Sequence, residues 1–270
     1  MINVRLSLSL VVLWAAGAIA RADVIALAAA HDTTIYESLA PFDYSSAELN
    51  KSNGAGDFIF AGRANSFNSG FIRRGLLAFD IAGAVPAGAT ITSASLRLYL
   101  SQTITSPVLA TAVGLHRIDR AWGEGASDAS GQEGGGANAQ PRDATWLHTS
   151  FDAETWTLPG GDFATIASAT TSVGDRNSFY SWSSPAMAAD AQLWLEQPAA
   201  NFGWLLLGDE SVQGTAKRFD SRDSFNFDIV AGARTIPLLT IEYTVVPEPR
   251  ANMLLLLGAA VAARRKFRRH

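Results

Sequence analysis

The sequence of 270 residues contains no cysteine. No disulfide can therefore stabilise the fold, and its stability must come from a hydrophobic core. Histidine is also scarce, and the three histidines before the C-terminal segment (His31, His116 and His148) show no metal-ligand spacing. The sequence has no Gly-x-Ser-x-Gly elbow and no phosphate-binding loop either. These absences argue against a cysteine or serine hydrolase, a zinc site and nucleotide binding, so we expect no catalysis.

The N-terminus has the features of a secretory signal peptide. Arg5 supplies a positive charge, residues 6–16 form an apolar stretch, and two small-x-small cleavage patterns follow it. We therefore predict that residues 1–22 are a signal peptide and that the protein is exported. The mature chain is expected to start at Arg21 or Asp23.

The C-terminal segment 246–270 combines a Pro-Glu-Pro box, an apolar stretch and an arginine-rich tail. The apolar stretch, 251–263, has 13 residues, whereas a helix that spans a bilayer needs about 20. The cationic tail should stay on the cytoplasmic side, so the segment is predicted to hold the chain transiently, and a permanent tail anchor is the alternative. The residues expected to direct processing are Pro247, Glu248, Pro249, Arg264 and Arg265.

This C-terminal pattern resembles the PEP-CTERM sorting signal of Gram-negative bacteria. The resemblance implies an exosortase-type processing enzyme as a partner and a transient association with the inner membrane. It also implies a final location at the outer envelope surface or in the extracellular matrix.

Basic residues are scarce once both end segments are set aside. The whole chain has 21 lysines and arginines against 25 acidic residues, and eight of the basic residues lie in the two end segments. Residues 22–249 therefore carry 13 basic and 25 acidic side chains, a net charge of −12. This balance opposes binding to phosphate backbones, so we do not expect nucleic acid as a partner.

Strand signals are frequent in the remaining chain, and helix signals are scarce. Residues 90–100 alternate, with three leucines on one face, and short apolar runs bounded by glycine or proline recur. Many short strands with turn signals are typical of an antiparallel β-sandwich or jelly roll. The one convincing helix is 185–196, because Pro185 suits a first turn and an apolar face follows it. We therefore predict an all-β single domain over 23–245 with one short helix.

The segment 123–141 differs from the rest, because it holds six glycines among many alanines and serines. We expect a long flexible loop here, and a loop of this length is either functional or disordered. The sandwich pattern resumes after it, so no domain boundary is expected.

An ordered set of segments covers nearly all of 23–245: 32–36, 74–81, 85–91, 93–100, 116–118, 121–125 with its Trp-x-Glu-Gly corner, 144–146, Trp156, 159–162, 201–207, 218–223 and 237–243. This set resembles the DNRLRE domain, which is also classed as a carbohydrate-binding module. The resemblance implies a non-catalytic β-sandwich of secreted bacterial proteins, linked to binding acidic polysaccharides such as alginate. The glycine-rich insertion, Leu147 in place of a frequent asparagine and the lack of an accompanying enzyme depart from that family.

Sugar binding has the clearest physical basis among the candidate functions. An exposed indole can pack on the apolar face of a pyranose ring, and an arginine can hold a uronate carboxylate bidentately. Core packing or ordinary ion pairing is the alternative for each candidate, and Trp194 and Trp204 are expected in the core. The carbohydrate-binding candidates are Trp122, Trp146, Trp156, Arg74, Arg117 and Arg222.

Calcium is the one cofactor to consider, because exported sandwiches often use it and it takes only oxygen ligands. The sequence has no EF-hand spacing. The acidic residues that could donate to a structural calcium ion are Asp32, Asp162, Asp220 and Asp223.

The sequence thus predicts a non-catalytic, exported surface or matrix protein that binds an acidic, uronate-rich exopolysaccharide. A structural biofilm-matrix or adhesion protein without glycan binding is one alternative, and a polysaccharide-degrading enzyme is another. The enzyme would need a carboxylate pair about 5–10 Å apart, which a sequence does not reveal. An exposed aromatic row with arginine neighbours would favour binding, and an exposed sheet edge would favour assembly. A cleft with two close carboxylates, one with a raised pKa, would favour catalysis.

Overall fold

A computed structural model describes residues 21–37, 50–65, 71–104, 109–228 and 232–245. The chain divides into one compact unit, Ala22–Thr244, and a second unit, Met1–Arg21 with Val245–His270, which lies almost wholly outside the described residues. Strands make up 44% of the described residues, and helices make up 8%. The predicted all-β, sandwich-like fold is therefore confirmed.

The elements of the described residues follow one another in this order: β1 (Arg21–Ala28), β2 (His31–Tyr36), β3 (Lys51–Ser52), β4 (Phe58–Arg63), β5 (Ile72–Ala78), β6 (Thr90–Gln102), β7 (Thr111–Arg117), β8 (Ala137–Asn138), β9 (His148–Ser150), β10 (Glu154–Thr155), β11 (Ala169–Val173), β12 (Ser178–Ser183), α1 (Pro185–Glu196), a 3-10 turn (Pro198–Ala200), β13 (Trp204–Leu207), β14 (Lys217–Asp220), β15 (Phe227–Asp228), β16 (Ala233–Arg234) and β17 (Leu238–Val245).

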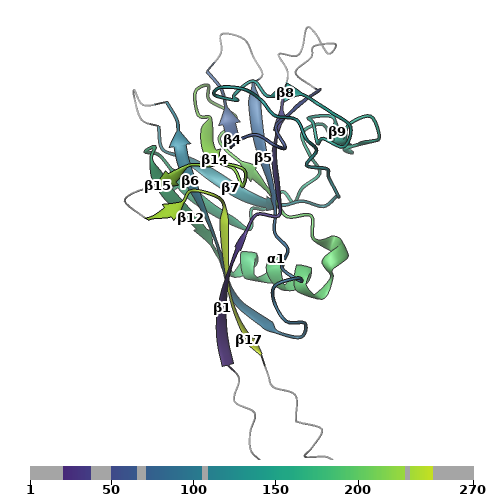
Figure 1. The fold of residues 1–270 in the computed structure, drawn as a ribbon, viewed down its shortest axis with the longest axis vertical. Coiled ribbons are helices and arrows are strands. Elements are labelled where there is room, and N and C mark those ends of the chain that lie inside the picture. The colour runs from purple at the N-terminus through teal and green to yellow at the C-terminus, as the bar shows by residue number, and fades with distance from the viewer. Residues whose placement is uncertain (1–20, 38–49, 66–70, 105–108, 229–231, 246–270) are drawn as a thin grey trace, which may run out of the picture. The chain divides into compact units, whose positions relative to one another are not determined.

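Eleven of these strands form one antiparallel sheet that curls over on itself (Figure 1). The strand order is β1-β17-β6-β14-β4-β5-β13-β7-β11, with β12 added beside β6 and β2 beside β5. The long strand β6 is therefore a central strand of one layer, and β5 and β13 are central strands of the other. Most neighbours in this order are far apart in the sequence, so residues of distant segments meet at the ends of the strands.

Strand β4 joins the two layers, because it changes partner along its length. Its first residues pair with β14, with Phe58 opposite Asp220, while Gly62 pairs with Arg73 of β5. Gly62 has a φ of +103°, and a Cβ there would lie 3.0 Å from the carbonyl oxygen of Thr215. Only glycine accepts this backbone conformation without strain, so the change of layer depends on it.

The core follows from the alternation that the sequence shows along β6. Leu96, Leu98 and Leu100 are fully buried, as predicted, and the residues between them are partly exposed. Trp182 of β12 packs edge-on against Phe219 of β14, with ring centroids 6.0 Å apart. Burial of these large apolar side chains supplies the stabilisation that a chain without disulfides needs.

The predicted helix is present as α1, with the bounds that the sequence indicates. The side chain of Ser184 caps its N-terminus by accepting a hydrogen bond from the Met187 backbone N–H, and Pro185 occupies the first turn. Its apolar face is buried on the sheet, where Trp194 lies edge-on to Trp204 with centroids 4.6 Å apart. Both tryptophans are fully buried, which confirms the expectation for them.

The glycine-rich segment 123–141 is irregular and long, but it is fastened to the sandwich. Strand β8 within it pairs with β3. The buried Glu133 accepts hydrogen bonds from Asn53 Nδ2 and from the backbone N–H groups of Asp57 and Phe58, at 2.7 to 3.1 Å. The hydroxyl of Tyr36 donates to the Glu133 carbonyl oxygen at 3.1 Å. These anchors make the segment a fixed part of the surface, rather than the freely flexible loop that its composition indicates.

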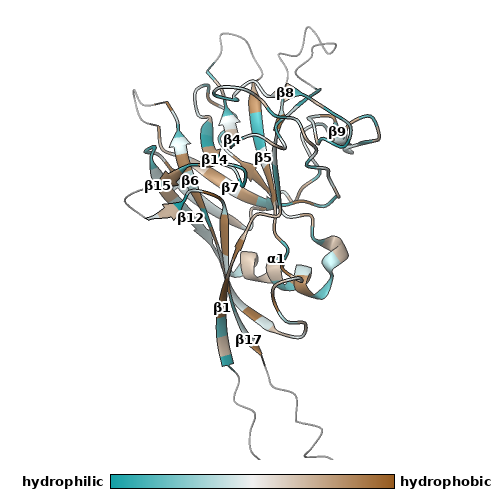
Figure 2. Cartoon of the chain, in the orientation of Figure 1, coloured by the Kyte–Doolittle hydropathy of each residue, from teal (hydrophilic) through white to brown (hydrophobic). Residues whose placement is uncertain are grey.

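The hydropathy of strand β5 changes along its length. In Figure 2 the strand β5 carries a hydrophilic band within an otherwise hydrophobic strand, and its sequence places Arg73 and Arg74 there. Among the described residues, no helix has both the length and the apolarity needed to cross a membrane. The apolar stretches 6–16 and 251–263 lie outside the described residues.

Candidate functional site

A surface hollow of about 420 Å³ opens beside the start of segment 123–141. It is lined by His31, Pro141, Arg142 and residues 122–126, and we call it the Trp122 hollow. A smaller hollow of about 250 Å³ shares His31 and Trp122 with it. The half-buried Trp122 therefore lies between two depressions of the surface.

Trp122 is held in a fixed position by its polar end. Its indole N–H donates to the carbonyl oxygen of Phe202 at 2.8 Å. The ring also packs on a buried cluster that includes Ile118, Trp146 and Trp156. A tryptophan that is anchored at one edge and partly open to solvent is suited to present its apolar surface to a ligand.

Two glycines shape the rim of the Trp122 hollow. A Cβ on Gly123 would lie 1.9 Å from the carbonyl oxygen of Arg142, and one on Gly125 would lie 1.4 Å from Asp143 Oδ1. The backbone N–H of Ala144 donates to the Gly123 carbonyl oxygen at 2.7 Å. The two sides of the rim are therefore in backbone contact, which only glycine permits at these positions.

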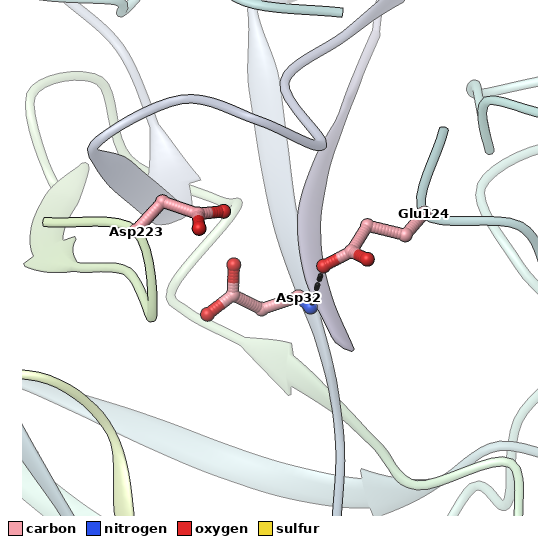
Figure 3. Close-up of side chains that lie close together, drawn as sticks. All are labelled: Asp32, Glu124 and Asp223. Carbon is pink, nitrogen blue, oxygen red and sulfur yellow. Dashed lines mark hydrogen bonds between the residues drawn. The ribbon is translucent and has the colours of Figure 1, made fainter. Parts of the chain in front are cut away.

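Three carboxyl groups from distant parts of the chain meet next to this rim (Figure 3). Asp32 belongs to β2, Glu124 lines the hollow, and Asp223 follows β14; one oxygen of each lies within 4.8 Å of the other two. We call these residues the acidic cluster. The three carboxyl groups face a common point, with one oxygen of Asp32 directed toward Asp223.

The hydrogen bonds of the acidic cluster are unevenly distributed. Glu124 accepts from the backbone N–H of Asp32 at 2.9 Å, from Arg222 Nε at 2.7 Å and from Arg222 Nη2 at 3.2 Å, and it lies 2.9 Å from His31 Nδ1. Asp32 Oδ2 accepts from the Arg222 backbone N–H at 2.8 Å. Asp32 Oδ1 is buried and has no hydrogen-bond partner among the described residues.

Burial and like charge act together on the acidic cluster. Burial, chiefly, raises the pKa of Asp32 to about 8, and the charges of Glu124 and Asp223 add to this, although the hydrogen bond from the Arg222 backbone opposes it. Burial also raises the pKa of Asp223, against the opposing charge of Arg222. The cluster thus carries an excess of negative charge that a proton or a cation would neutralise.

The structure separates the three predicted sugar-binding tryptophans into two groups. Trp122 lines the hollow, whereas Trp146 is 7% exposed and Trp156 is 5% exposed. The indole N–H of Trp156 donates to the Thr145 carbonyl oxygen at 2.8 Å. Trp146 and Trp156 therefore pack in the core, and they do not form the exposed aromatic row that would favour sugar binding.

The three predicted arginines all pair with carboxylates of this chain. Arg74 Nε and Nη2 lie 2.7 and 2.8 Å from the two oxygens of Glu210. Arg222 pairs with Glu124 as described, and Arg117 lies 3.4 Å from Asp190 and 3.8 Å from Asp119. A uronate would have to compete with these partners.

The four aspartates predicted as calcium donors are not all together. Asp32 and Asp223 meet in the acidic cluster. Asp162 accepts from the backbone N–H groups of Thr157 and Leu158, and Asp220 accepts from Thr235 and Asn226. Through these hydrogen bonds, Asp162 and Asp220 stabilise local turns at other places in the fold.

The sequence did not indicate Glu124 and His31 as site residues, and Arg142 is one of the arginines considered for a uronate but not one of the three predicted candidates. Glu124 belongs to the Trp-x-Glu-Gly corner, and this motif is the one feature of the sequence that could have indicated a role for it. The residues around Glu124 do not reveal that its side chain faces Asp32. The sorting residues Pro247, Glu248, Pro249, Arg264 and Arg265 lie outside the described residues.

Comparison with known proteins adds no assignment. No protein-family model matches the chain, and no curated protein matches its sequence.

Proposed function

We propose that this protein is an exported, non-catalytic surface or matrix protein that binds an acidic exopolysaccharide in the Trp122 hollow. The observation that carries the proposal is the half-buried indole of Trp122, which lines the hollow together with His31 and Arg142. The export and sorting part rests on the two end segments of the sequence and on their resemblance to a signal peptide and a PEP-CTERM signal. The DNRLRE resemblance stays a prediction that favours the same function.

The hollow offers both kinds of contact that a uronate needs. The indole surface suits the apolar face of a pyranose ring, and the exposed Arg142 can hold a carboxylate by a charge-assisted hydrogen bond. Glu124 would repel a polyanion, but Arg222 and His31 already contact its two oxygens. The net negative charge of the domain should make such binding weak, and the local attraction between Arg142 and a carboxylate should weaken further as the salt concentration rises.

One observation favours the polysaccharide-degrading enzyme instead. Asp32 and Glu124 are close carboxyl groups, and one of them has a strongly raised pKa, which is the arrangement of a general acid and its partner. Asp32 has no exposed surface, however, and does not line the hollow. A glycosidic oxygen could not reach its carboxyl group, so we propose binding without cleavage.

The test is affinity electrophoresis and calorimetry of the purified full chain with alginate, other uronate polymers and neutral glucans, at low and high salt. We expect retention on uronate polymers at low salt and its loss at high salt. Trp122→Ala and Arg142→Gln should each weaken binding about tenfold, which corresponds to about 1.4 kcal/mol. Arg176→Gln changes an exposed arginine elsewhere and should leave binding unchanged.

Two other results would overturn the proposal. Absence of retention on every polymer would favour the structural matrix protein. Release of unsaturated or reducing sugar ends by the wild-type chain, abolished in Asp32→Asn, would favour the enzyme.

A further inference from the structure

We infer that Asp32, Glu124 and Asp223 form a calcium-binding site that ties together β2, the rim of the Trp122 hollow and the turn after β14. This site goes beyond the proposed glycan binding and does not depend on it. Three features of the acidic cluster carry the inference: its spacing, its uncompensated charge and the unpartnered oxygen of Asp32.

The spacing of the carboxyl oxygens fits one calcium ion. Calcium binds oxygen ligands at about 2.3–2.6 Å, so two ligands on opposite sides of the ion are about 4.6–5.2 Å apart. The three oxygens of the acidic cluster lie within 4.8 Å of one another. One ion can therefore contact all three groups after small side-chain movements.

When all three groups are ionised, the charge of the cluster also fits a divalent cation. Among the described residues, the salt bridges place one guanidinium, that of Arg222, against these carboxyl groups. Three carboxylates and one guanidinium leave two negative charges, which a divalent ion balances. His31 contacts Glu124 and adds charge only in its protonated form.

The Asp32 side chain is the observation that separates this cluster from an ordinary group of surface acids. It is fully buried, and its Oδ1 has no hydrogen-bond partner among the described residues. A buried carboxylate oxygen without a partner costs free energy, and Figure 3 shows the Asp32 carboxyl facing those of Glu124 and Asp223. A calcium ion at this point would supply the missing partner.

The surroundings indicate a site of moderate affinity. The Asp223 side chain is 38% exposed, so water molecules can complete the six to eight ligands that calcium takes. Arg222 competes with the ion for Glu124, since its Nε lies 2.7 Å from Oε1. We therefore expect a dissociation constant on the order of 10⁻⁴ to 10⁻³ M, as in extracellular calcium modules.

The experiment is isothermal titration calorimetry and thermal unfolding of the EDTA-treated full chain with CaCl₂, and with MgCl₂ at the same concentration. Calcium at roughly ten times its dissociation constant should raise the melting temperature by about 3–6 °C. Asp223→Asn and Asp32→Asn should each remove this shift. Asp119→Asn, which changes a half-exposed acid paired with Arg117, should keep it.

The outcomes separate a metal site from a structural role. Asp32→Asn retains an acceptor for the Arg222 backbone N–H and places a neutral group at the buried position, so it should fold and melt normally in EDTA. If it does not fold, the partly exposed Asp223→Asn decides the question. No shift with calcium in the wild-type chain, an equal shift with magnesium, or a shift retained in Asp223→Asn would overturn the inference.

Discussion

The guanidinium carbon of Arg74 lies 4.6 Å from the centre of the Trp146 ring. The same guanidinium is held bidentately by Glu210, and its Nη1 donates to the Gly160 carbonyl oxygen at 2.6 Å. Two residues that the sequence predicts at a sugar-binding surface therefore contact each other inside the domain. Their shared position makes them a brace of the fold, because a cation–π contact and a desolvated ion pair reinforce one geometry.

Arg74→Ala should lower the free energy of unfolding by about 2–3 kcal/mol, since it leaves the largely buried Glu210 carboxylate without its partner. Urea unfolding, followed by tryptophan fluorescence, measures the change. Arg117→Ala is the matched control, because Arg117 is 39% exposed and its ion pairs are long; it should cost less than about 1 kcal/mol. Equal stability of the two variants would contradict the role of Arg74 as a brace.

Trp156→Ala should destabilise the domain by about 3–5 kcal/mol, because it empties a buried site in the cluster beneath Trp122. Trp156→Phe keeps most of the apolar volume and loses the hydrogen bond to Thr145, so it should fold and retain polysaccharide. Denaturant unfolding and affinity electrophoresis on the same samples measure both effects. If a stable Trp156→Phe chain lost its binding to the polysaccharide, Trp156 would be a residue that contacts the polysaccharide.

Glu133→Ala should release the glycine-rich segment from the sandwich. The substitution leaves three donors unpaired, on Asn53, Asp57 and Phe58, and each buried unpaired donor costs about 1–3 kcal/mol. Limited proteolysis should then cut within 123–141 faster than in the wild-type chain. Asp128→Ala changes an exposed acid of the same segment and should leave the cleavage rate unchanged; faster cleavage in that control would mean that the segment is mobile regardless of Glu133.

Lys217 should make the stability depend on pH in the alkaline range. Its side chain is fully buried on β14 and donates to Thr103 Oγ1 and to the Leu109 carbonyl oxygen, and burial lowers its pKa below the ordinary value of 10.5. The folded state therefore binds fewer protons than the unfolded state between the lowered pKa and 10.5. The destabilisation is complete below the folded-state pKa and is relieved as the pH rises through this window.

The difference in melting temperature between the wild-type chain and Lys217→Met, recorded from neutral pH to about pH 10, isolates this effect because other titrating groups cancel. The difference should move in favour of the wild-type chain as the pH rises. A difference that stays constant would show that Lys217 titrates alike in both states.

The fold could be predicted from local patterns because those patterns are strong. The alternation along 90–100 fixes which face of β6 is buried, and Pro185 with the apolar face after it fixes where α1 begins. Both predictions can be made without information on which strands are neighbours in the sheet. The segment 123–141 was harder, because its glycine content resembles that of a linker, and the anchors of Glu133 come from residues some 80 positions earlier.

The site could be predicted only in part, since it depends on contacts between distant segments. Asp32 and Glu124 are separated by 92 residues and meet only because of the strand order of the sheet. Burial of Trp146 and Trp156 likewise follows from how segment 144–156 folds over Ile35 and Leu205. A tryptophan near a predicted loop looks the same in sequence whether its ring is covered or open.

The strand order has a further consequence for how this chain acquires its structure. The hydroxyl of Thr92 donates to the Glu242 carbonyl oxygen, 150 residues later, and that of Ser101 to the Arg218 carbonyl oxygen, 117 residues later. Folds dominated by such distant pairings form slowly. Because β17 follows all the other described strands in the chain, the edge of β6 that pairs with β17 stays unpaired until residues 238–245 have been synthesised.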